Sequence, residues 1–224
     1  MGYFIAIDGL DGSGKKTQSD RLTEHLRSKG IKVRELDFPV YESDSSYFVK
    51  MYLNGELGRD PSETNAFAAS MFFAADRYVS YRRDWKSDHL DPDTVIIANR
   101  YTTANAIHQL SKLPEEDWDD FIGWLTDFEF SRLGLPSPDL VLFLELPPEV
   151  SLSMVESRSN ETGRVKDIHE LDREHMKKSY RAGLYASEKL GWTRISCADE
   201  SGTAMRSRDD IFADVIAAVD KLLH

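Results

Sequence analysis

The sequence predicts a three-layer α/β/α fold, in which helices cover both faces of a five-stranded parallel sheet. Two observations predict it. Short apolar segments of strand length alternate with longer helical segments along the whole chain, as in proteins built from βαβ units. The first apolar segment, Tyr3–Ile7, leads directly into a glycine-rich turn and a helical segment, which is the order that a phosphate-binding loop requires.

The first two strands enclose the clearest helix. Thr17–Lys29 is predicted to be helical because Leu22 and Leu26 share one face. Gly30 follows it as a stop signal. Apolar residues alternate along Ile31–Phe38, which predicts the second strand. A strand, a helix and a strand in this order indicate a parallel pair with a right-handed crossover.

The middle of the chain alternates in the same way. A short helix is expected at Tyr47–Leu53 and a long one from Asn65 to about Asp84. Thr94–Ala98 is short and rich in β-branched residues, and it predicts a third strand that is buried on both faces. Pro114 opens another helix, with acidic residues at its positive end. Two of these helices carry apolar residues in excess: Phe67, Met71, Ala74, Ala75 and Tyr78 on one, and Trp118, Phe121, Ile122, Leu125 and Phe128 on the other.

The last third completes the pattern. Leu140–Leu146 and Thr193–Cys197 predict the fourth and fifth strands. Helices are expected from the Pro147-Pro148 pair to about Ser157, over Glu170–Leu190 and over Asp209–Leu222. Residues 158–168 are polar, contain a glycine and carry several cations. We therefore expect a cationic loop at about 158–168.

The composition is that of an acidic globular protein. The chain has 224 residues, of which 41% are hydrophobic and 30% charged, and its formal net charge is −11. We expect a single domain over residues 1–224. The charge argues against binding to a nucleic acid polymer or a membrane surface, because both would need a basic face. With one cysteine and no stretch that resembles a signal peptide or a membrane span, we expect a cytoplasmic protein.

The turn after the first strand fits the phosphate-binding spacing G-x-x-x-x-G-K, with Gly9, Gly14 and Lys15 at the defining positions. Backbone N–H groups of such a loop and the following helix N-terminus bind phosphate oxygens. Lys15 would then reach the β- and γ-phosphates. The next residue is Lys16, where the standard motif has a serine or threonine that binds Mg²⁺. The predicted triphosphate site comprises Gly9, Leu10, Asp11, Gly12, Ser13, Gly14, Lys15, Lys16 and Thr17.

A phosphate-binding loop does not by itself distinguish a kinase from a GTPase or an ATPase. Cationic, amide and aromatic side chains near the predicted strand ends supply a second set of candidates: Phe38, Phe73, Arg77, Arg100, Asn105 and the loop 158–168. Ligands of open α/β sheets bind at this edge. Without further information, Phe73 could equally be a core residue, Arg77 a solvated surface residue and Asn105 a helix cap.

Several segments together make the chain similar to the thymidylate kinase family of P-loop nucleoside monophosphate kinases. They are Ile7 to Lys15, Phe38-Pro39, Phe73 to Arg77, Asn99-Arg100-Tyr101, Arg132 to Asp139 and Gly163 to Asp167. The resemblance implies a P-loop NTPase fold and transfer of the ATP γ-phosphate to dTMP. The product would be dTDP, on the way to dTTP. It also implies Mg²⁺ as cofactor and a homodimer.

The resemblance also implies roles for individual residues. Phe73 would stack on the thymine ring, Arg77 would bind a thymine carbonyl and Asn105 would recognise the N3–H edge. Arg100 would hold the acceptor phosphate. Asp11 would contact the acceptor 3′-hydroxyl and approach the metal, together with Glu170, whose alternative is an acidic helix start. The loop at about 158–168 would be a short, mobile LID. Since Ser13 stands where some members have a catalytic arginine, Arg164 of this lid would supply that charge. The resulting catalytic set is Lys15, Arg164, Asp11 and Arg100, and the acceptor set is Asp11, Phe38, Phe73, Arg77, Arg100, Asn105 and His108.

Four positions depart from the family pattern. Lys16 replaces the metal-binding hydroxyl, Asn99 replaces an aspartate, Val40 replaces a second phosphate-binding arginine, and His108 replaces a tyrosine that helps to exclude a ribose 2′-hydroxyl. Val40 and His108 leave open a kinase for another pyrimidine nucleotide or a deoxynucleoside. Lys16 and Asn99 leave open a nucleotide-binding protein with impaired catalysis.

Overall fold

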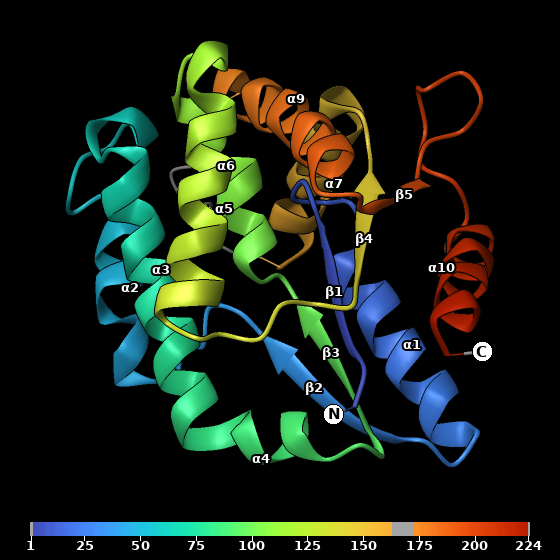
Figure 1. Cartoon of the computed structure of the whole chain (residues 1–224). Helices are drawn as coiled ribbons and strands as arrows, with labels where there is room; N and C mark the ends of the chain where they lie inside the picture. Colours follow the sequence, from blue (N-terminus) through green and yellow to red (C-terminus); the bar gives the residue numbers. More distant parts are fainter. Residues whose placement is uncertain (1, 163–172, 224) are drawn as a thin grey trace.

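The structure is a computed structural model and describes residues 2–162 and 173–223. Its centre is a parallel sheet of five strands in the order β2-β3-β1-β4-β5. The strands are β1 (Phe4–Gly9), β2 (Lys32–Asp37), β3 (Thr94–Asn99), β4 (Leu140–Glu145) and β5 (Thr193–Ser196). The five predicted strands and their parallel arrangement are confirmed. β1 lies in the middle, so the loop that follows it opens at the centre of the carboxyl edge (Figure 1).

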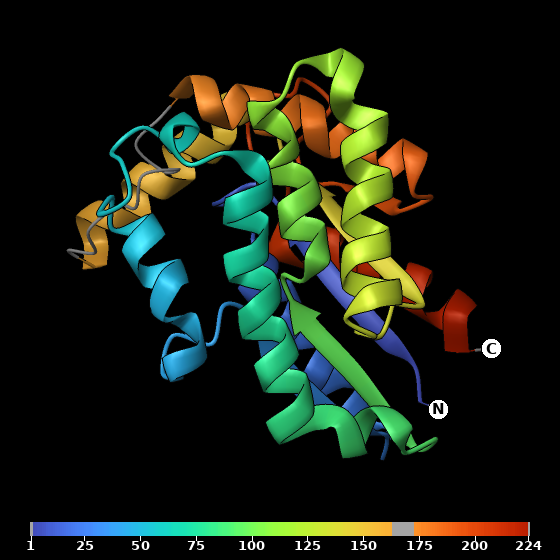
Figure 2. The same cartoon turned by 60° about the vertical axis from the view of Figure 1, so that its left-hand side comes forward.

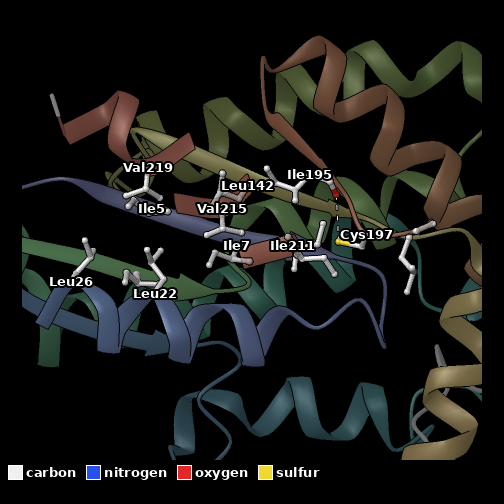
Figure 3. Close-up of a cluster of buried hydrophobic side chains, with 14 of the residues drawn as sticks. Ile5, Ile7, Leu22, Leu26, Leu142, Ile195, Cys197, Ile211, Val215 and Val219 are labelled. Carbon is white, nitrogen blue, oxygen red and sulfur yellow. Dashed lines mark hydrogen bonds between the residues drawn. The ribbon is translucent and has the colours of Figure 1, made fainter. Parts of the chain in front are cut away.

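Two helices cover one face of the sheet. They are α1 (Lys15–Ser28) and α10 (Arg208–Leu223). Figure 3 shows Leu22 and Leu26 of α1 and Val215 and Val219 of α10 around Ile5 and Ile7 of β1, all with relative exposures of 0 or 1%. This apolar layer holds the start of α1, and with it the predicted phosphate-binding loop, against β1.

The opposite face is covered by more helices. α5 (Thr102–His108) and α9 (Arg173–Lys189) pack over β1 and β4, where Phe143, Ile107 and Met176 meet in one buried cluster. α3 (Ala66–Ser80) continues through a π-helical turn, Tyr81–Trp85, into α4 (Lys86–Leu90). α6 (Trp118–Thr126) runs beside α5, as Figure 2 shows. α2 (Tyr47–Leu53) and α7 (Pro148–Thr162) complete the set.

Some helix boundaries differ from expectation. The helix α5 was not predicted: all of its residues but Ala104 are buried, so it lacks the polar face that gives a surface helix its periodic pattern. The loop expected from residue 158 is wrong for residues 158–162, because α7 continues to Thr162. Between residues 149 and 162 the sequence contains no glycine or proline that would end the helix earlier. The rest of the predicted lid, with Arg164, and also Glu170, lies outside the described residues.

The two helices with excess apolar residues behave differently. On α6, the side chains of Trp118, Phe121, Ile122 and Leu125 are buried within the chain. On α3, Phe67, Met71 and Tyr78 are 44, 51 and 38% exposed. Ala74, which was predicted on the same stripe, is fully buried. The apolar face of α6 is therefore core, whereas that of α3 is divided between the core and the surface. In the part of the chain that the structure describes, no helix has the length and apolar character needed to cross a membrane.

Candidate active site

The loop between β1 and α1 surrounds the side chain of Lys15. Its ammonium nitrogen donates to the carbonyl oxygens of Gly9 at 3.0 Å and Leu10 at 2.8 Å, and lies 3.5 Å from Oδ1 of Asp11. The side chain is only 7% exposed. Burial lowers the pKa of Lys15 to about 8, with the neighbouring Arg100 as a further cause. The ammonium group of Lys15 therefore lies inside the loop that would enclose the phosphates.

Two glycines allow the loop to take this shape. Gly14 precedes α1 with a φ of 89°, in the left-handed region that glycine adopts without strain. At Gly9, a Cβ would lie 2.5 Å from the carbonyl oxygen of Leu144 on β4. Glycine therefore lets the loop begin close against the neighbouring strand. These are the two glycines that the phosphate-binding spacing requires.

Lys16 points to the outside of this loop. Its ammonium group binds the carboxylate of Asp20, one turn further along α1, and lies 3.3 Å from Oε1 of Glu35 on β2. These contacts, that with Asp20 first, raise its pKa. Thr17, the next residue, lines the cavity described below. Lys16 thus takes part in a surface ion-pair group.

Arg100 lies at the carboxyl end of β3 and faces the same loop. It is the one residue other than glycine with a positive φ, 64°, in the described part of the chain, a conformation that costs free energy and clusters at functional sites. Its guanidinium binds the carboxylate of Asp11 and donates from Nη1 to Nε2 of His108 at 3.2 Å. Asp11 therefore stands between two cations, Lys15 and Arg100.

His108 and Asp8 complete this group of charges. Because arginine can only donate, Nε2 of His108 must accept, so the ring is neutral with its proton on Nδ1. Burial and then the charge of Arg100 lower the pKa of His108 well below its usual value. Asp8 is fully buried, and its two oxygens accept from the hydroxyl of Thr103 at 2.6 Å and the N–H of Gly9 at 2.8 Å.

A cavity of about 630 Å³ opens above these residues, within the usual size of ligand sites. Its charged lining comprises the basic residues Lys15, Lys16, Arg77, Arg100 and Arg208 and the acidic residues Asp11 and Asp37. The whole chain carries a formal charge of −11. A cavity with an excess of cations in such a chain is suited to a strongly anionic ligand.

Polar and aromatic residues of α3 and α5 form the end of the cavity opposite the phosphate-binding loop. Phe73, Arg77 and Asn105 all line it. Arg77 is bound by Glu129, a carboxylate with no exposed surface, through Nε at 2.7 Å and Nη2 at 2.5 Å. Asn105 donates to Oε1 of Glu129 at 3.1 Å and to the carbonyl of Ser70 at 3.3 Å. This end of the cavity presents oriented hydrogen-bonding groups beside an aromatic ring.

Two of the departures from the family pattern have partners on neighbouring elements. Asn99 donates from Nδ2 to Oδ1 of Asp37 at 2.8 Å, across the β2–β3 pair. Burial raises the pKa of Asp37. The backbone N–H of Val40 donates to Oδ2 of Asp76 at 2.8 Å. A carboxylate therefore lies next to position 99, although it comes from β2.

Twelve of the predicted residues line this one cavity. They are Asp11, Gly12, Gly14, Lys15, Lys16, Thr17, Phe38, Phe73, Arg77, Arg100, Asn105 and His108. Gly9 and Leu10 lie beneath it and hold Lys15, and Ser13 is fully buried. Arg164 and Glu170 lie outside the described residues.

Several residues of this region were not predicted from the sequence, and four of them matter most for its chemistry. Asp37, Met205 and Arg208 also line the cavity, and Glu129 lies behind its polar end. The signal for Glu129 was present, because it follows Leu125 by four residues and so continues the apolar stripe of α6. A carboxylate at a buried position requires a cationic or hydrogen-bonding partner. Met205 lies just before α10 and Arg208 is the first residue of that helix. No local pattern connects either of them to the phosphate-binding loop.

Comparisons with known proteins agree with one family. The family model described as "Thymidylate kinase" matches residues 7–203. A thymidylate kinase of Mycobacterium tuberculosis is 31% identical over 191 residues, which cover 84% of this chain and 86% of that protein. A probable thymidylate kinase of Pyrococcus horikoshii is 29% identical over 218 residues, 97% of this chain and 96% of that one. A thymidylate kinase structure from Candida albicans has a similar fold, with a TM-score of 0.68, 20% identity and coverage of 98% of this chain and 92% of that chain.

Proposed function

The chain belongs to the thymidylate kinase family and is a dTMP kinase, a phosphotransferase that uses ATP, and from this premise we propose how its cavity divides between the two nucleotides. The triphosphate of ATP lies on the loop from Gly9 to Thr17, with Lys15 at its β- and γ-phosphates. The dTMP lies between Arg100 and the Phe73–Arg77–Asn105 end. The observation that carries this assignment is that one cavity of about 630 Å³ holds both sets of residues, with Asp11 between them.

The proposed reaction is direct transfer of the γ-phosphoryl group. An oxygen of the dTMP phosphate attacks the γ-phosphorus, a new P–O bond forms, and the bond to the β–γ bridging oxygen breaks. The protein's task is to align the two phosphates and to neutralise the charge on the transferred group. Lys15 and the loop N–H groups act on the donor side. Arg100 anchors the attacking phosphate, and Arg164 supplies a further cation.

Asp11 connects the two halves of the site. It binds Arg100 and lies 3.5 Å from Nζ of Lys15. Once phosphates engage these two cations, its carboxylate becomes available to the 3′-hydroxyl of the acceptor sugar. His108 contacts Arg100 and lines the cavity, and we propose that it limits the space next to that sugar. We therefore assign acceptor selectivity to Asp11 and His108 as well as to the base site.

The oxygen ligands that the loop offers fit Mg²⁺. This ion usually keeps several waters and binds through one or two carboxylates together with substrate phosphates. Asp11 and Thr17, both of the phosphate-binding loop, line the cavity. Among the described residues there is no group of three or more histidine, cysteine or acidic side chains that could hold a metal ion with protein ligands alone. Asp11, with Glu170, would hold the ion, which supplies positive charge to the phosphates when bound.

We also propose that two copies associate through the outward face of α3. Phe67, Met71 and Tyr78 lie there on one exposed stripe, and the neighbouring α2 adds Tyr47 and Phe48, which are 58 and 54% exposed. Exposed apolar patches of this kind mark protein interfaces.

The chain is proposed to act as one domain in the cytoplasm, where its nucleotide substrates occur.

The assignment of Lys15 is tested by substitution. Lys15→Ala should lower kcat for dTMP at least ~100-fold, the effect of removing one electrostatic stabiliser. Lys32→Ala is the matched control, since Lys32 begins β2 at the opposite end of the sheet and is 61% exposed. A coupled assay of ADP release measures both variants. Near-normal turnover by Lys15→Ala would show that the donor site lies elsewhere.

A further inference from the structure

Glu129 is the most heavily bonded carboxylate at the polar end of the cavity. It belongs to the π-helical turn Asp127–Arg132 that follows α6, and its side chain has no exposed surface. Its oxygens accept from Nε and Nη2 of Arg77, from Nδ2 of Asn105, and from the hydroxyl of Thr102 at 2.7 Å. Thus α3, α5 and the π-helical turn meet at one buried charge.

These contacts determine which hydrogens Arg77 can offer. A guanidinium has five N–H groups. Two of them bind Glu129, and a third, on Nη1, binds the carbonyl oxygen of Tyr101 at 3.2 Å. Within the described part of the chain this leaves one hydrogen on each terminal nitrogen. Because Glu129 also cancels the charge, Arg77 presents itself to the cavity as a donor to a neutral carbonyl oxygen.

The same carboxylate determines how the amide of Asn105 is turned. Both hydrogens of its Nδ2 are used, one by Oε1 of Glu129 and one by the carbonyl oxygen of Ser70. A carboxylate can only accept, so the amide nitrogen must face it. The remaining polar atom of this side chain is Oδ1, an acceptor. The cavity thus combines a donor, Arg77, with an acceptor, Asn105.

We propose that Glu129 is a positioning residue that sets the hydrogen-bond polarity of the base site. This inference rests on the proposed binding of the base by Phe73, Arg77 and Asn105. Thymine and uracil present a carbonyl oxygen at C4 and an N–H at N3, which complement the donor and the acceptor. Cytosine presents an amino group at C4 and a lone pair at N3, so both positions would clash in polarity. Glu129 therefore selects 4-keto pyrimidines without touching the nucleotide.

The test is the variant Glu129→Gln. A glutamine offers one acceptor and two donors, so it cannot accept from Arg77 and Asn105 as the carboxylate does. Asn105 then turns its Oδ1 towards the new amide and its Nδ2 towards the base. We expect KM for dTMP to rise about tenfold, the effect of one lost hydrogen bond, with kcat at saturating dTMP within about threefold of the wild type. The kcat/KM ratio of dTMP to dCMP should fall at least ~10-fold.

Two further variants separate positioning from a structural role. Glu145→Gln is the matched control: Glu145 on β4 binds Nε and Nη2 of Arg194 at 2.9 and 2.8 Å, outside the cavity lining, and its substitution should leave the dTMP to dCMP ratio unchanged. Glu129→Asp keeps the polarity of the carboxylate although it shortens the side chain. It should retain the ratio within about threefold while KM rises. Circular dichroism and thermal unfolding verify that each variant is folded.

The outcomes distinguish this inference from the proposed function. If Asn105→Ala leaves the dTMP to dCMP ratio unchanged, the proposed base site is wrong. If Asn105→Ala lowers the ratio but folded Glu129→Gln keeps it, the role of Glu129 alone is overturned. Should Glu129→Gln not fold, Glu129→Asp decides. If Glu129→Asp retains the dTMP to dCMP ratio, the inference is supported. A tenfold loss of this ratio in the folded Glu129→Asp protein overturns it.

Discussion

At the scale of single residues, Lys15 shows how burial changes the protonation of a cation. Two loop carbonyl oxygens and Asp11 surround its ammonium group, and burial lowers its pKa to about 8. The loss of water makes the charged form costly until an anion arrives. A triphosphate bound beside it should restore the charged form. The spacing of Gly9, Gly14 and Lys15 predicted a phosphate-binding loop with Lys15 at the phosphates. The contacts of Lys15 with the carbonyl oxygens of Gly9 and Leu10, and its lowered pKa, were found only in the structure.

Binding of the donor nucleotide should therefore be accompanied by proton uptake. At pH 8, about half of the Lys15 side chains are neutral before ATP binds, and the phosphates favour the charged form. We expect uptake of about 0.5 proton per site at pH 8 and almost none at pH 6.5. Isothermal titration calorimetry in buffers of different ionisation enthalpy measures it. Lys15→Arg, which stays charged, should show no uptake, and equal uptake by both proteins would contradict the assignment to Lys15.

His108 should make the stability of the protein depend on pH. Its pKa in the folded protein lies well below the usual value, so below pH ~6.5 the unfolded chain binds a proton that the folded protein does not. Stability is then full above pH ~6.5 and is lost as the pH falls towards the folded pKa. Arg100 and Lys15 oppose protonation, as does His175, whereas Asp11 favours it.

The variant His108→Gln isolates this effect. Glutamine can still accept from Arg100 but does not titrate. Between pH 7.0 and 5.5, the free energy of unfolding of the wild-type protein should fall by about 1 kcal/mol more than that of the variant. Urea unfolding followed by circular dichroism measures both. Parallel pH profiles would mean that the pKa of His108 is the same in the folded and the unfolded protein.

At the scale of elements, close packing decides where glycine is needed. Gly183 lies in α9 over the sheet, and a Cβ there would lie 2.7 Å from Cζ of Phe143 on β4. Gly123 lies in α6 with nothing within 4 Å of such an atom. Both are helical glycines, so helix propensity treats them alike. Only their surroundings distinguish them.

Replacement of each glycine by alanine should therefore have opposite effects. Gly183→Ala should destabilise the protein by about 1–3 kcal/mol, since the added methyl group overpacks the contact with Phe143. Gly123→Ala should stabilise it by up to about 1 kcal/mol through helix propensity. Chemical denaturation of both variants provides the comparison. A stabilising Gly183→Ala would show that α9 can move away from β4.

The packing between elements also explains why Glu129 was not predicted from the sequence, although Arg77 and Asn105 were. Arg77 and Asn105 belong to segments that resemble a family or follow a strand end. Glu129 acts from a third segment, through contacts with α3 and α5. Their approach depends on how three helices pack, which the pattern of one helix does not contain.

At the scale of the whole molecule, the outward stripe of α3 predicts a dimer. Phe67, Met71 and Tyr78 are exposed, whereas most other large apolar side chains of the protein are buried. Met71→Glu should place a charge in the centre of this stripe. We expect the wild-type protein to sediment as a dimer at micromolar concentration and Met71→Glu as a monomer with its fold retained. Sedimentation velocity measures both.

Leu90→Glu is the matched control. Leu90 is 52% exposed, like Met71 at 51%, but it ends α4, outside the α3 stripe. Its substitution should leave the dimer intact. A wild-type protein that remains monomeric at micromolar concentration would remove the dimer, and dissociation by both variants would show that any added charge weakens the association.

The sequence by itself determined the five strands and their parallel arrangement, and it predicted the phosphate-binding chemistry of the loop after β1. These follow from periodicity and spacing within short segments, because local apolar patterns select strand or helix. It also supplied twelve of the residues that line the cavity, through motifs and family resemblance. The tertiary structure decided what no single segment contains. It placed Asp11 between Lys15 and Arg100, brought Arg208 to the loop of residues 9–17, and buried Glu129 behind Arg77 and Asn105. The physical reason is that burial and charge pairing arise between segments far apart in the chain, where only packing sets the distance.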